Sequence, residues 1–351
     1  MSDAAEEKSR RAGRRREAPD GRQSGARGRR RLPIAWIAWI VAIPLLFGAD
    51  RLLAAALNPY VARILILSGI NIVLAVSLNL INGFTGQFSL GHAGFMAIGG
   101  YAAAWFSLVV GPSFGPSLQV VSFLVALALG SGLAALAGLL IGIPTLRLRG
   151  DYLAIATLGF GEIIRVVILN LEFLGGARGL TGIPPRTTFF WVYLAVVACV
   201  VFHANLVRSR HGRALLAVRD DEVAAESLGV PTTRYKIQAF VIGAAWAGLA
   251  GGLFGHYLMY LHTNSFTFMK SIEVVIMVVL GGMGSITGSI LAAIVLTVLP
   301  EALREFREYR MVLYSLLLIV LMIARPQGMF GTRELPRVWQ QLRERVQRRG
   351  A

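Results

Sequence analysis

The sequence has few of the residues with which a soluble protein covers its surface. Only 15% of its 351 residues are charged, whereas about a quarter are charged in an ordinary soluble domain. Hydrophobic residues make up 55% of the chain, and the mean hydropathy is +0.62. The single cysteine, Cys199, excludes an internal disulfide framework and a thiolate metal cage. The composition therefore excludes a soluble globular domain and indicates a membrane protein.

The chain also lacks the short motifs of common enzyme sites. It contains no GxxxxGK[ST], HExxH, CxxC or GxSxG motif and no dinucleotide-binding fingerprint. Its five histidines do not have the spacing of metal ligands. We therefore predict that the chain is not an enzyme, has no metal site and holds no cofactor. Without a P-loop, it is not expected to bind ATP itself.

The formal charge of +16 is compatible with a nucleic-acid partner or with membrane topology. Residues 1–31 hold eleven Lys and Arg against five acids, and residues 325–351 hold seven Arg against two Glu. A nucleic-acid surface would gather basic residues on one folded face, but here they flank apolar runs, as the positive-inside rule describes. We expect no nucleic-acid partner. Residues 1–32 should be a disordered basic tail resting on anionic lipid, and 332–351 a second basic tail, both cytoplasmic.

Long apolar runs fill the chain between these tails. A helix needs about 20 apolar residues to cross the hydrocarbon core, which is about 30 Å thick. The runs predict an all-α, polytopic membrane protein with a transmembrane domain over residues 33–331. They lie at 33–49, 60–81, 89–110, 119–143, 152–173, 189–207, 235–260, 271–299 and 311–325.

Nine crossings would place the two basic tails on opposite sides of the membrane, against the charge rule. The run at 271–299 is too long for one helix of normal tilt, and Gly281, Gly282 and Gly284 interrupt it. Splitting it into 271–281 and 285–299 gives ten crossings and places both tails inside. We therefore predict nine or ten crossings, with ten favoured by the charge.

A second glycine-rich break, NGFTGQFSLG, occupies residues 82–91. Two such breaks in the two halves of a chain point to internal repeats and to a pathway at mid-membrane depth. Irregular backbone persists there only where protein or a water-filled cavity covers it. The polar residues of the break are therefore candidates for the translocation path, or else they belong to a cytoplasmic turn between two helices. They are Asn82, Gln87, Ser89 and His92.

Two acids lie inside apolar runs, where a charge costs about 2.5–3.5 kcal/mol on insertion scales. Glu162 is three residues before Arg165, and Glu273 is three residues after Lys270. The spacing puts each pair on one helix face. The favoured interpretation is a neutralised structural pair, and the alternative is that Glu162 and Glu273 line the translocation path.

The longest polar segment, 208–234, contains a predicted helix over 213–229. It is rich in Ala and Leu, and it ends at Gly229 before Val-Pro. Its four acids disfavour a position on an anionic membrane. We therefore expect this amphipathic helix to dock in the groove of a partner protein.

Four blocks in order resemble the permease subunits of branched-chain amino acid ABC importers, most closely the LivM-type half of the permease pair. The resemblance covers about residues 60–331. The blocks are SLNLINGFTGQFSLGHAGFMAIGGY (77–101), RDDEVAAESLGVPTTRYKIQAFVIGAAWAGLAGGL (219–253), SIEVVIMVVLGGMGS (271–285) and ARPQGMFG (324–331).

The resemblance implies a multi-pass subunit of the bacterial inner membrane that serves high-affinity uptake. Its partners would be a homologous second permease subunit, two cytoplasmic ATPase subunits that bind the ATP, and an extracytoplasmic solute-binding protein. The helix at 213–229 would be the coupling helix that seats in an ATPase groove. Its candidate coupling residues are Arg219, Asp220, Glu222, Ala224, Ala225 and Gly229.

The chain departs from the family pattern at three places. Val223 stands where the importer coupling motif has Glu, Ala177-Arg178 replaces Ser-Asn, and Ser289 replaces Pro. The related urea and short-amide permeases share much of the pattern, so a urea or amide permease is the alternative within the family. An ion-coupled secondary carrier is a further alternative, for which only Glu162 and Glu273 are available as titratable path residues.

Overall fold

The computed structural model describes residues 58–148 and 150–303, together with scattered positions between 44 and 51 and between 312 and 329. The predicted tails, most of the predicted crossings 33–49 and 311–325, and the segment 304–310 lie outside the described residues. The described part is helical except for one pair of two-residue strands and the connecting loops. The expectation of an all-α membrane protein is confirmed.

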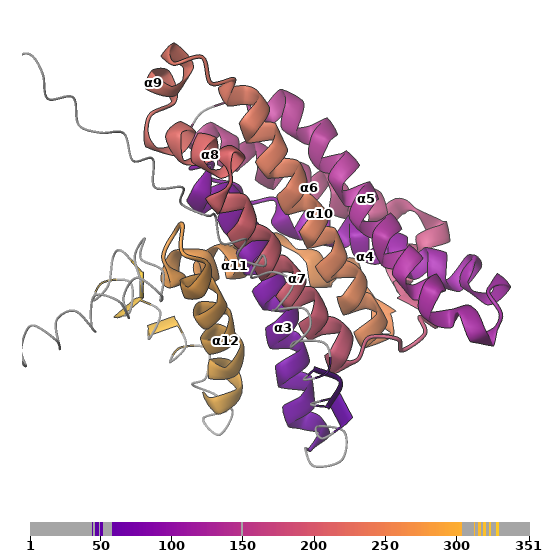
Figure 1. Ribbon diagram of the computed structural model, residues 1–351. Coiled ribbons are helices and arrows are strands. Elements are labelled where there is room, and N and C mark those ends of the chain that lie inside the picture. Colours follow the sequence, from indigo (N-terminus) through magenta and orange to yellow (C-terminus); the bar gives the residue numbers. More distant parts are fainter. Residues whose placement is uncertain are drawn as a thin grey trace, which may run out of the picture. The chain divides into compact units, whose positions relative to one another are not determined.

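Seven helices are long and apolar enough to cross a membrane, counting only the described residues. Their ends agree with the predicted runs to within about three residues, because each run is bounded by polar or helix-breaking residues. They are α3 (Pro59–Asn79, continued by the π-helical turn η1, Leu80–Phe84), α4 (His92–Val109), α5 (Gln119–Thr145), α6 (Asp151–Asn170), α7 (Phe189–Arg208), α10 (Thr232–Leu258) and α11 (Phe268–Gly281), which reaches this length only together with the 3-10 turn at Thr263–Phe266 before it (Figure 1).

The predicted split of the run 271–299 is confirmed. Helix α11 ends at Gly281, and α12 begins at Ile286 and extends to Ala302. Gly282 has φ 106°, a conformation that side chains with a Cβ rarely adopt. Ser285 then caps α12, because its hydroxyl accepts a hydrogen bond from the Gly288 amide at 3.1 Å.

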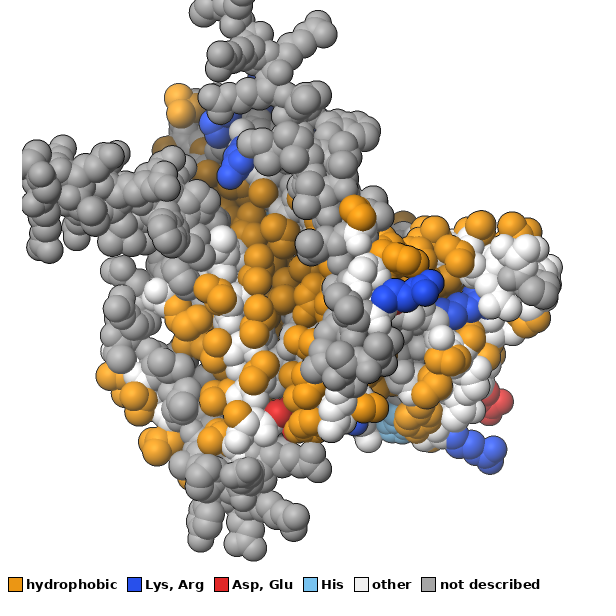
Figure 2. Space-filling model, turned by 60° about the horizontal axis from the view of Figure 1, so that its bottom comes forward, with side chains coloured by type: hydrophobic (Ala, Val, Ile, Leu, Met, Phe, Trp, Pro, Cys, Tyr) orange, Lys and Arg blue, Asp and Glu red, His pale blue; other side chains and the backbone are white. Residues whose placement is uncertain are grey.

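The most buried helices are α3, α4 and α10, whereas fewer than a third of the residues in the spans of α5, α6 and α7 are buried. Small residues let the central helices approach closely: a Cβ on Gly99 of α4 would lie 2.2 Å from the Gly248 Cα of α10. Lipid tails are as apolar as the helix surfaces, so the hydrophobic effect does not drive helices together in a membrane. Close van der Waals packing of this kind stabilises their association instead. The outer helices present Val, Leu and Ile, and apolar side chains cover much of the face in Figure 2.

The predicted coupling helix over 213–229 is wrong as a single helix. The structure has two helices, α8 (Arg210–Asp220) and α9 (Glu222–Ser227), separated at Asp221. Asp221 is extended, and its carboxylate accepts hydrogen bonds from the amides of Val223 and Ala224 at 2.9 and 3.0 Å. An aspartate favours this capping geometry over a helix interior, and it therefore starts a second helix.

The two ends of the bundle carry different structures (Figure 1). One end holds α8 and α9, and we call it the α8–α9 end. The strands β1 (Leu180–Thr181) and β2 (Tyr260–Leu261) form an antiparallel pair that joins the loops after α6 and α10, and these loops define the strand end. Short 3-10 turns complete the connections: η2 (Gly111–Ser113), η3 (Pro116–Leu118), η4 (Glu172–Leu174), η5 (Gly176–Arg178) and η6 (Thr263–Phe266).

The eight apolar helices of the described part alternate in direction. Helix α3 runs toward the α8–α9 end. Helix α12 runs away from that end, because Glu301, near the C-terminus of α12, accepts a hydrogen bond from the Tyr60 hydroxyl at the start of α3. Adding the predicted crossings at 33–49 and 311–325 would bring both tails to the α8–α9 side. The placement of the tails stays a prediction.

Candidate functional site

The two glycine-rich breaks, more than 190 residues apart in sequence, meet inside the bundle. Asn79 joins them: its side-chain oxygen accepts a hydrogen bond from the Gly284 amide at 2.8 Å, and its side-chain nitrogen donates to the Ser285 carbonyl at 3.0 Å. A Cβ on Gly83 would lie 2.3 Å from the Gly284 nitrogen, so backbone packs directly on backbone. We call Asn79, Gly83, Gly284 and Ser285 the glycine junction.

Arg219, near the end of α8, reaches this junction. Its Nη1 lies 3.4 Å from the Gly83 carbonyl, while Nε and Nη2 bind the Asp220 carboxylate at 2.9 and 2.8 Å. A Cβ on Gly86 would lie 2.9 Å from the Arg219 side chain, and one on Gly284 would lie 3.1 Å from its Nη1. The predicted coupling segment therefore touches both breaks through one guanidinium group.

Helix α9 is held to the bundle by its inner face. Ala225 is buried, and Glu222 forms an ion pair of 2.5 Å with Lys236 on α10. The outer face carries two exposed apolar side chains, Val223 and Leu228, of which 64% and 84% are exposed. The other exposed side chains of the segment 220–229 are polar or small, so Val223 and Leu228 are its two large apolar surface residues.

The structure thus divides the predicted coupling residues into two groups. The first group faces the bundle and consists of Arg219, Glu222 and Ala225. The second group faces outward or ends a helix and consists of Asp220, Ala224 and Gly229. Gly229 has φ 81° and follows α9 directly, as expected for a helix stop.

The polar residues of the first break are packed inside the protein. Asn82 bonds to the backbone of Ser89, accepting from its amide at 3.2 Å and donating to its carbonyl at 3.5 Å. His92 and the Ser77 hydroxyl lie 2.9 Å apart. The side-chain amide of Gln87 and the hydroxyl of Ser89 are buried and make no hydrogen bond with other described residues. The break is therefore a buried turn between α3 and α4.

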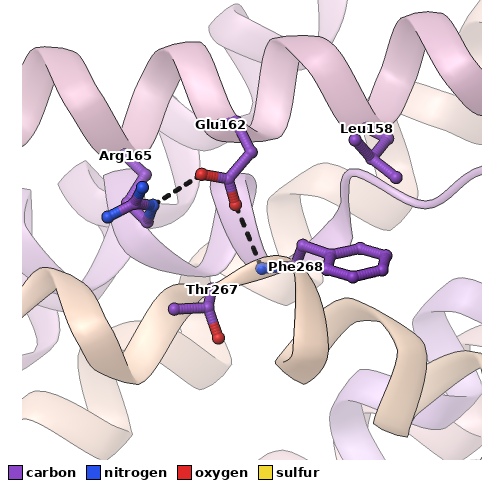
Figure 3. Close-up of a pocket in the computed structure, with 5 residues that line it drawn as sticks. All are labelled: Leu158, Glu162, Arg165, Thr267 and Phe268. Atoms are coloured by element: carbon purple, nitrogen blue, oxygen red, sulfur yellow. Dashed lines mark hydrogen bonds and ion pairs between the residues drawn. The ribbon is translucent and has the colours of Figure 1, made fainter.

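A different site lies between α6 and α11, in a hollow of about 380 Å³ lined by Leu158, Glu162, Arg165, Thr267 and Phe268 (Figure 3). We call it the α6–α11 hollow. The Glu162 carboxylate binds Arg165 Nε at 2.7 Å and accepts a hydrogen bond from the Phe268 amide at 3.1 Å. A carboxylate at the first turn of a helix stabilises its positive end. The predicted Glu162–Arg165 pair is therefore present, and it also fixes the start of α11.

The second predicted pair, Lys270 and Glu273, is also present at 3.0 Å. The Lys270 ammonium group donates a further hydrogen bond to Asn71 of α3 at 3.1 Å, and Asn71 donates to Thr297 of α12 at 2.9 Å. This network joins three helices. The structure places Glu162 on α6 against the first residue of α11 and Glu273 within α11. The residues of the first break lie elsewhere, between α3 and the start of α4.

Sequence reasoning missed three features of these sites. Asn79 is not among the residues that the sequence pattern singles out, although it joins both breaks. Val223 was taken as a departure from a motif rather than as an exposed contact, and the tie from Glu222 to Lys236 was not foreseen. The signal for Val223 and Leu228 was available, since they are apolar residues in a segment with four acids. Among the described residues, no group of three or more His, Cys, Asp or Glu could hold a metal ion.

Apolar helices of membrane-spanning length and a polar segment at one end are the features of a multi-pass membrane protein. Residues 60–324 match the family model for the permease component of the branched-chain amino acid transport system. The chain belongs to this family and is of the LivM type.

Three relatives illustrate the similarity. The chain is 40% identical over 298 residues to the high-affinity branched-chain amino acid transport system permease protein LivM of Escherichia coli K12. The matched region covers 75% of this chain and 68% of LivM. LivM of Salmonella typhimurium is 40% identical over 295 residues, covering 74% and 67%. LivH of the same organism is 36% identical over 154 residues, covering 42% of this chain and 48% of LivH. These relatives are transport permeases. No solved structure gave a significant match.

Proposed function

We propose that this chain is one half of a two-subunit permease that carries branched-chain amino acids into the cell. The relatives named for branched-chain amino acid transport support the substrate class. Similarity to both LivM and LivH supports a partner permease of related sequence. Two cytoplasmic ATPase subunits would supply the energy, and an extracytoplasmic binding protein would deliver the substrate to the strand end.

The observation that carries this proposal is the two-sided construction of α8 and α9. Val223 and Leu228 face outward, where an ATPase groove would take them, and Arg219 faces the glycine junction. A movement of the ATPase subunits would therefore shift a segment that contacts both breaks. In this mechanism the chain performs no chemistry on the substrate, and the ATP is bound and hydrolysed by the partners.

The proposed path runs beside the breaks and the start of α11. Glu162 and Glu273 are partly exposed on apolar helices, which supports a role in that path. Asn82, Gln87, Ser89 and His92 are buried in the present conformation, so they would line the path only after the junction opens. Both termini are proposed to lie in the cytoplasm, on the side of α8 and α9.

The test is co-purification of the ATPase subunits and uptake of labelled leucine by vesicles containing the full complex. The double variant Val223→Asp, Leu228→Asp should lose the ATPase subunits and uptake together, because two charges would enter an apolar contact. Met259→Asp is the matched control for co-purification of the ATPase subunits, which it should leave unchanged: it makes the same change at an exposed residue of the other end of the bundle, in a left-handed conformation that Asp tolerates. Retained ATPase binding in the double variant would contradict the coupling role. Uptake of urea without leucine would contradict the substrate class.

A further inference from the structure

A second hollow lies at the strand end, between the last turn of α4, the first residue of α5 and the segment that follows β1. Its volume is about 380 Å³, which is toward the lower end of the range of about 300–1,000 Å³ that small-molecule sites occupy. We call it the Arg186 pocket. Its wall includes the polar residues Ser107, Gln119 and Arg186 and the apolar residues Leu108, Phe114 and Pro184.

Arg186 supplies the only charge in the wall of this pocket. Its Nη1 donates to the Ser122 hydroxyl at 3.1 Å and to the Gln119 carbonyl at 3.4 Å. Its Nη2 points toward Gly111, where a Cβ would lie 3.8 Å from it. Within the described part of the chain, no ion pair involves Arg186, and its Nε and Nη2 make no hydrogen bond. A guanidinium group stays charged and holds a carboxylate through two parallel donors, so Arg186 has the donors for such a ligand.

Ser107 presents an acceptor to the same pocket. A neutral imidazole carries one proton, and His256 holds it on Nδ1, which lies 2.8 Å from the Gly252 carbonyl. Its Nε2 therefore accepts the hydrogen bond from the Ser107 hydroxyl at 2.7 Å. Because the Ser107 proton is used in this way, the oxygen keeps its lone pairs for a donor from a ligand, such as an ammonium group.

The rest of the wall is largely apolar. Leu108, Phe114 and Pro184 are half-buried, and the Phe114 ring packs against Phe106 with 6.3 Å between the ring centroids. The pocket therefore combines a cation, an acceptor oxygen and an apolar surface. A phosphate headgroup or the carboxylate of a protein side chain would use only the cation. An amino acid with an aliphatic side chain would use all three.

We propose that the Arg186 pocket binds the branched-chain amino acid at the strand end. This inference rests on the proposed function, which supplies the substrate. The carboxylate of the amino acid binds Arg186, its ammonium group donates to the Ser107 oxygen, and its aliphatic side chain lies against Phe114 and the neighbouring apolar wall. The site would hold the substrate on the permease before the bundle opens.

The test is equilibrium dialysis of labelled leucine against the purified complex of permease and ATPase subunits, without the binding protein. Arg186→Gln should weaken binding by about tenfold or more, since charge-assisted hydrogen bonds are lost, and Arg186→Lys should fall in between. Arg178→Gln is the matched control, because it removes an exposed charge at the same end but outside the pocket, and it should bind normally. Normal affinity in Arg186→Gln would overturn the proposal.

A second measurement needs no substitution. Leucinamide lacks the carboxylate, 4-methylpentanoate lacks the ammonium group, and glycine lacks the side chain. Each should displace labelled leucine from the complex about tenfold less well than leucine does, because each loses one of the three contacts. Displacement by leucinamide as strong as by leucine would contradict the role of Arg186. Displacement by inorganic phosphate at the same concentration would show a site for anions in general and would overturn the proposal.

Two other occupants give distinct results. Loss of leucine binding when phosphatidylglycerol is added to phosphatidylcholine vesicles would show that a lipid headgroup fills the pocket. Loss of the binding protein in Arg186→Gln, with normal leucine affinity, would make Arg186 a docking residue. Either result would overturn the proposal. The two proposals fail separately: leucine binding that depends on Arg186 without uptake would count against the transport assignment, and leucine uptake with normal affinity in Arg186→Gln would count against the pocket alone.

Discussion

The glycine junction and the α6–α11 hollow are both places where helices stop within the bundle, but they are built in opposite ways. At the junction, backbone packs on backbone, and Asn79 binds the second break through both polar atoms of its side chain. In the hollow, charged side chains stay partly exposed around about 380 Å³ of space. The junction is closed by contacts within this chain, whereas the hollow is open. We infer that the junction transmits movement.

The largest expected effect comes from filling the junction. In Gly83→Ala the new Cβ would lie 1.9 Å from Asn79 Oδ1 and 2.3 Å from the Gly284 nitrogen. Overpacking of this kind typically costs about 1–3 kcal/mol and more where backbone must move, so we expect a large loss of yield and a lower Tm. Gly159→Ala, beside the hollow on α6, meets nothing within 4 Å and should leave the Tm unchanged or slightly raised. Equal Tm values for the two variants would contradict the proposed difference in packing between the junction and the hollow.

Helix α3 carries one asparagine at the glycine junction, Asn79, and another that binds Lys270 of α11, Asn71, so that Asn→Ala can be compared at the two places. Asn79→Ala removes two buried hydrogen bonds and leaves the Gly284 amide without its acceptor, at a cost of about 1–3 kcal/mol. Asn71→Ala, two turns earlier on α3, leaves Lys270 paired with Glu273. Thermal melting of the purified complex should therefore fall further for Asn79→Ala than for Asn71→Ala. A larger loss for Asn71→Ala would show that the hollow side carries more of the stability.

Arg219 tests whether the junction transmits movement. Arg219→Gln keeps a polar side chain but loses the charge and the fork that spans Asp220 and the Gly83 carbonyl. Leucine uptake should fall about tenfold, within the usual range of coupling energies, while the ATPase subunits still co-purify and hydrolyse ATP. Arg213→Gln, at an exposed position of α8, is the matched control and should transport normally. If uptake and ATP hydrolysis fell together, Arg219 would be a docking residue and not a transmitting one.

The sequence predicts the crossings well because the thickness of the membrane sets their length. It also predicts the split at Gly281–Gly284, since length, glycine content and charge topology agree there. The break at Asp221 was missed because Ala and Leu on both sides favour one helix, and capping by a single carboxylate outweighs that preference locally. The role of Asn79 could not be read from local pattern, since its partners Gly284 and Ser285 are more than 200 residues away. The strand pair of residues 180–181 and 260–261 is too short to leave a pattern of alternation.

The smallest expected effect separates the two interpretations of the Glu162–Arg165 pair. Glu162→Gln retains an oxygen for the Phe268 amide but leaves the Arg165 charge without its partner. We expect a few-fold loss of uptake and a small fall in Tm, because the pair is partly exposed and such pairs contribute about 0–1 kcal/mol. The double variant Glu162→Gln, Arg165→Gln removes both charges and should recover the Tm. If uptake recovers as well, the pair is only a neutralised structural contact. If uptake stays low while the Tm recovers, the two charges act in transport and not only in stability.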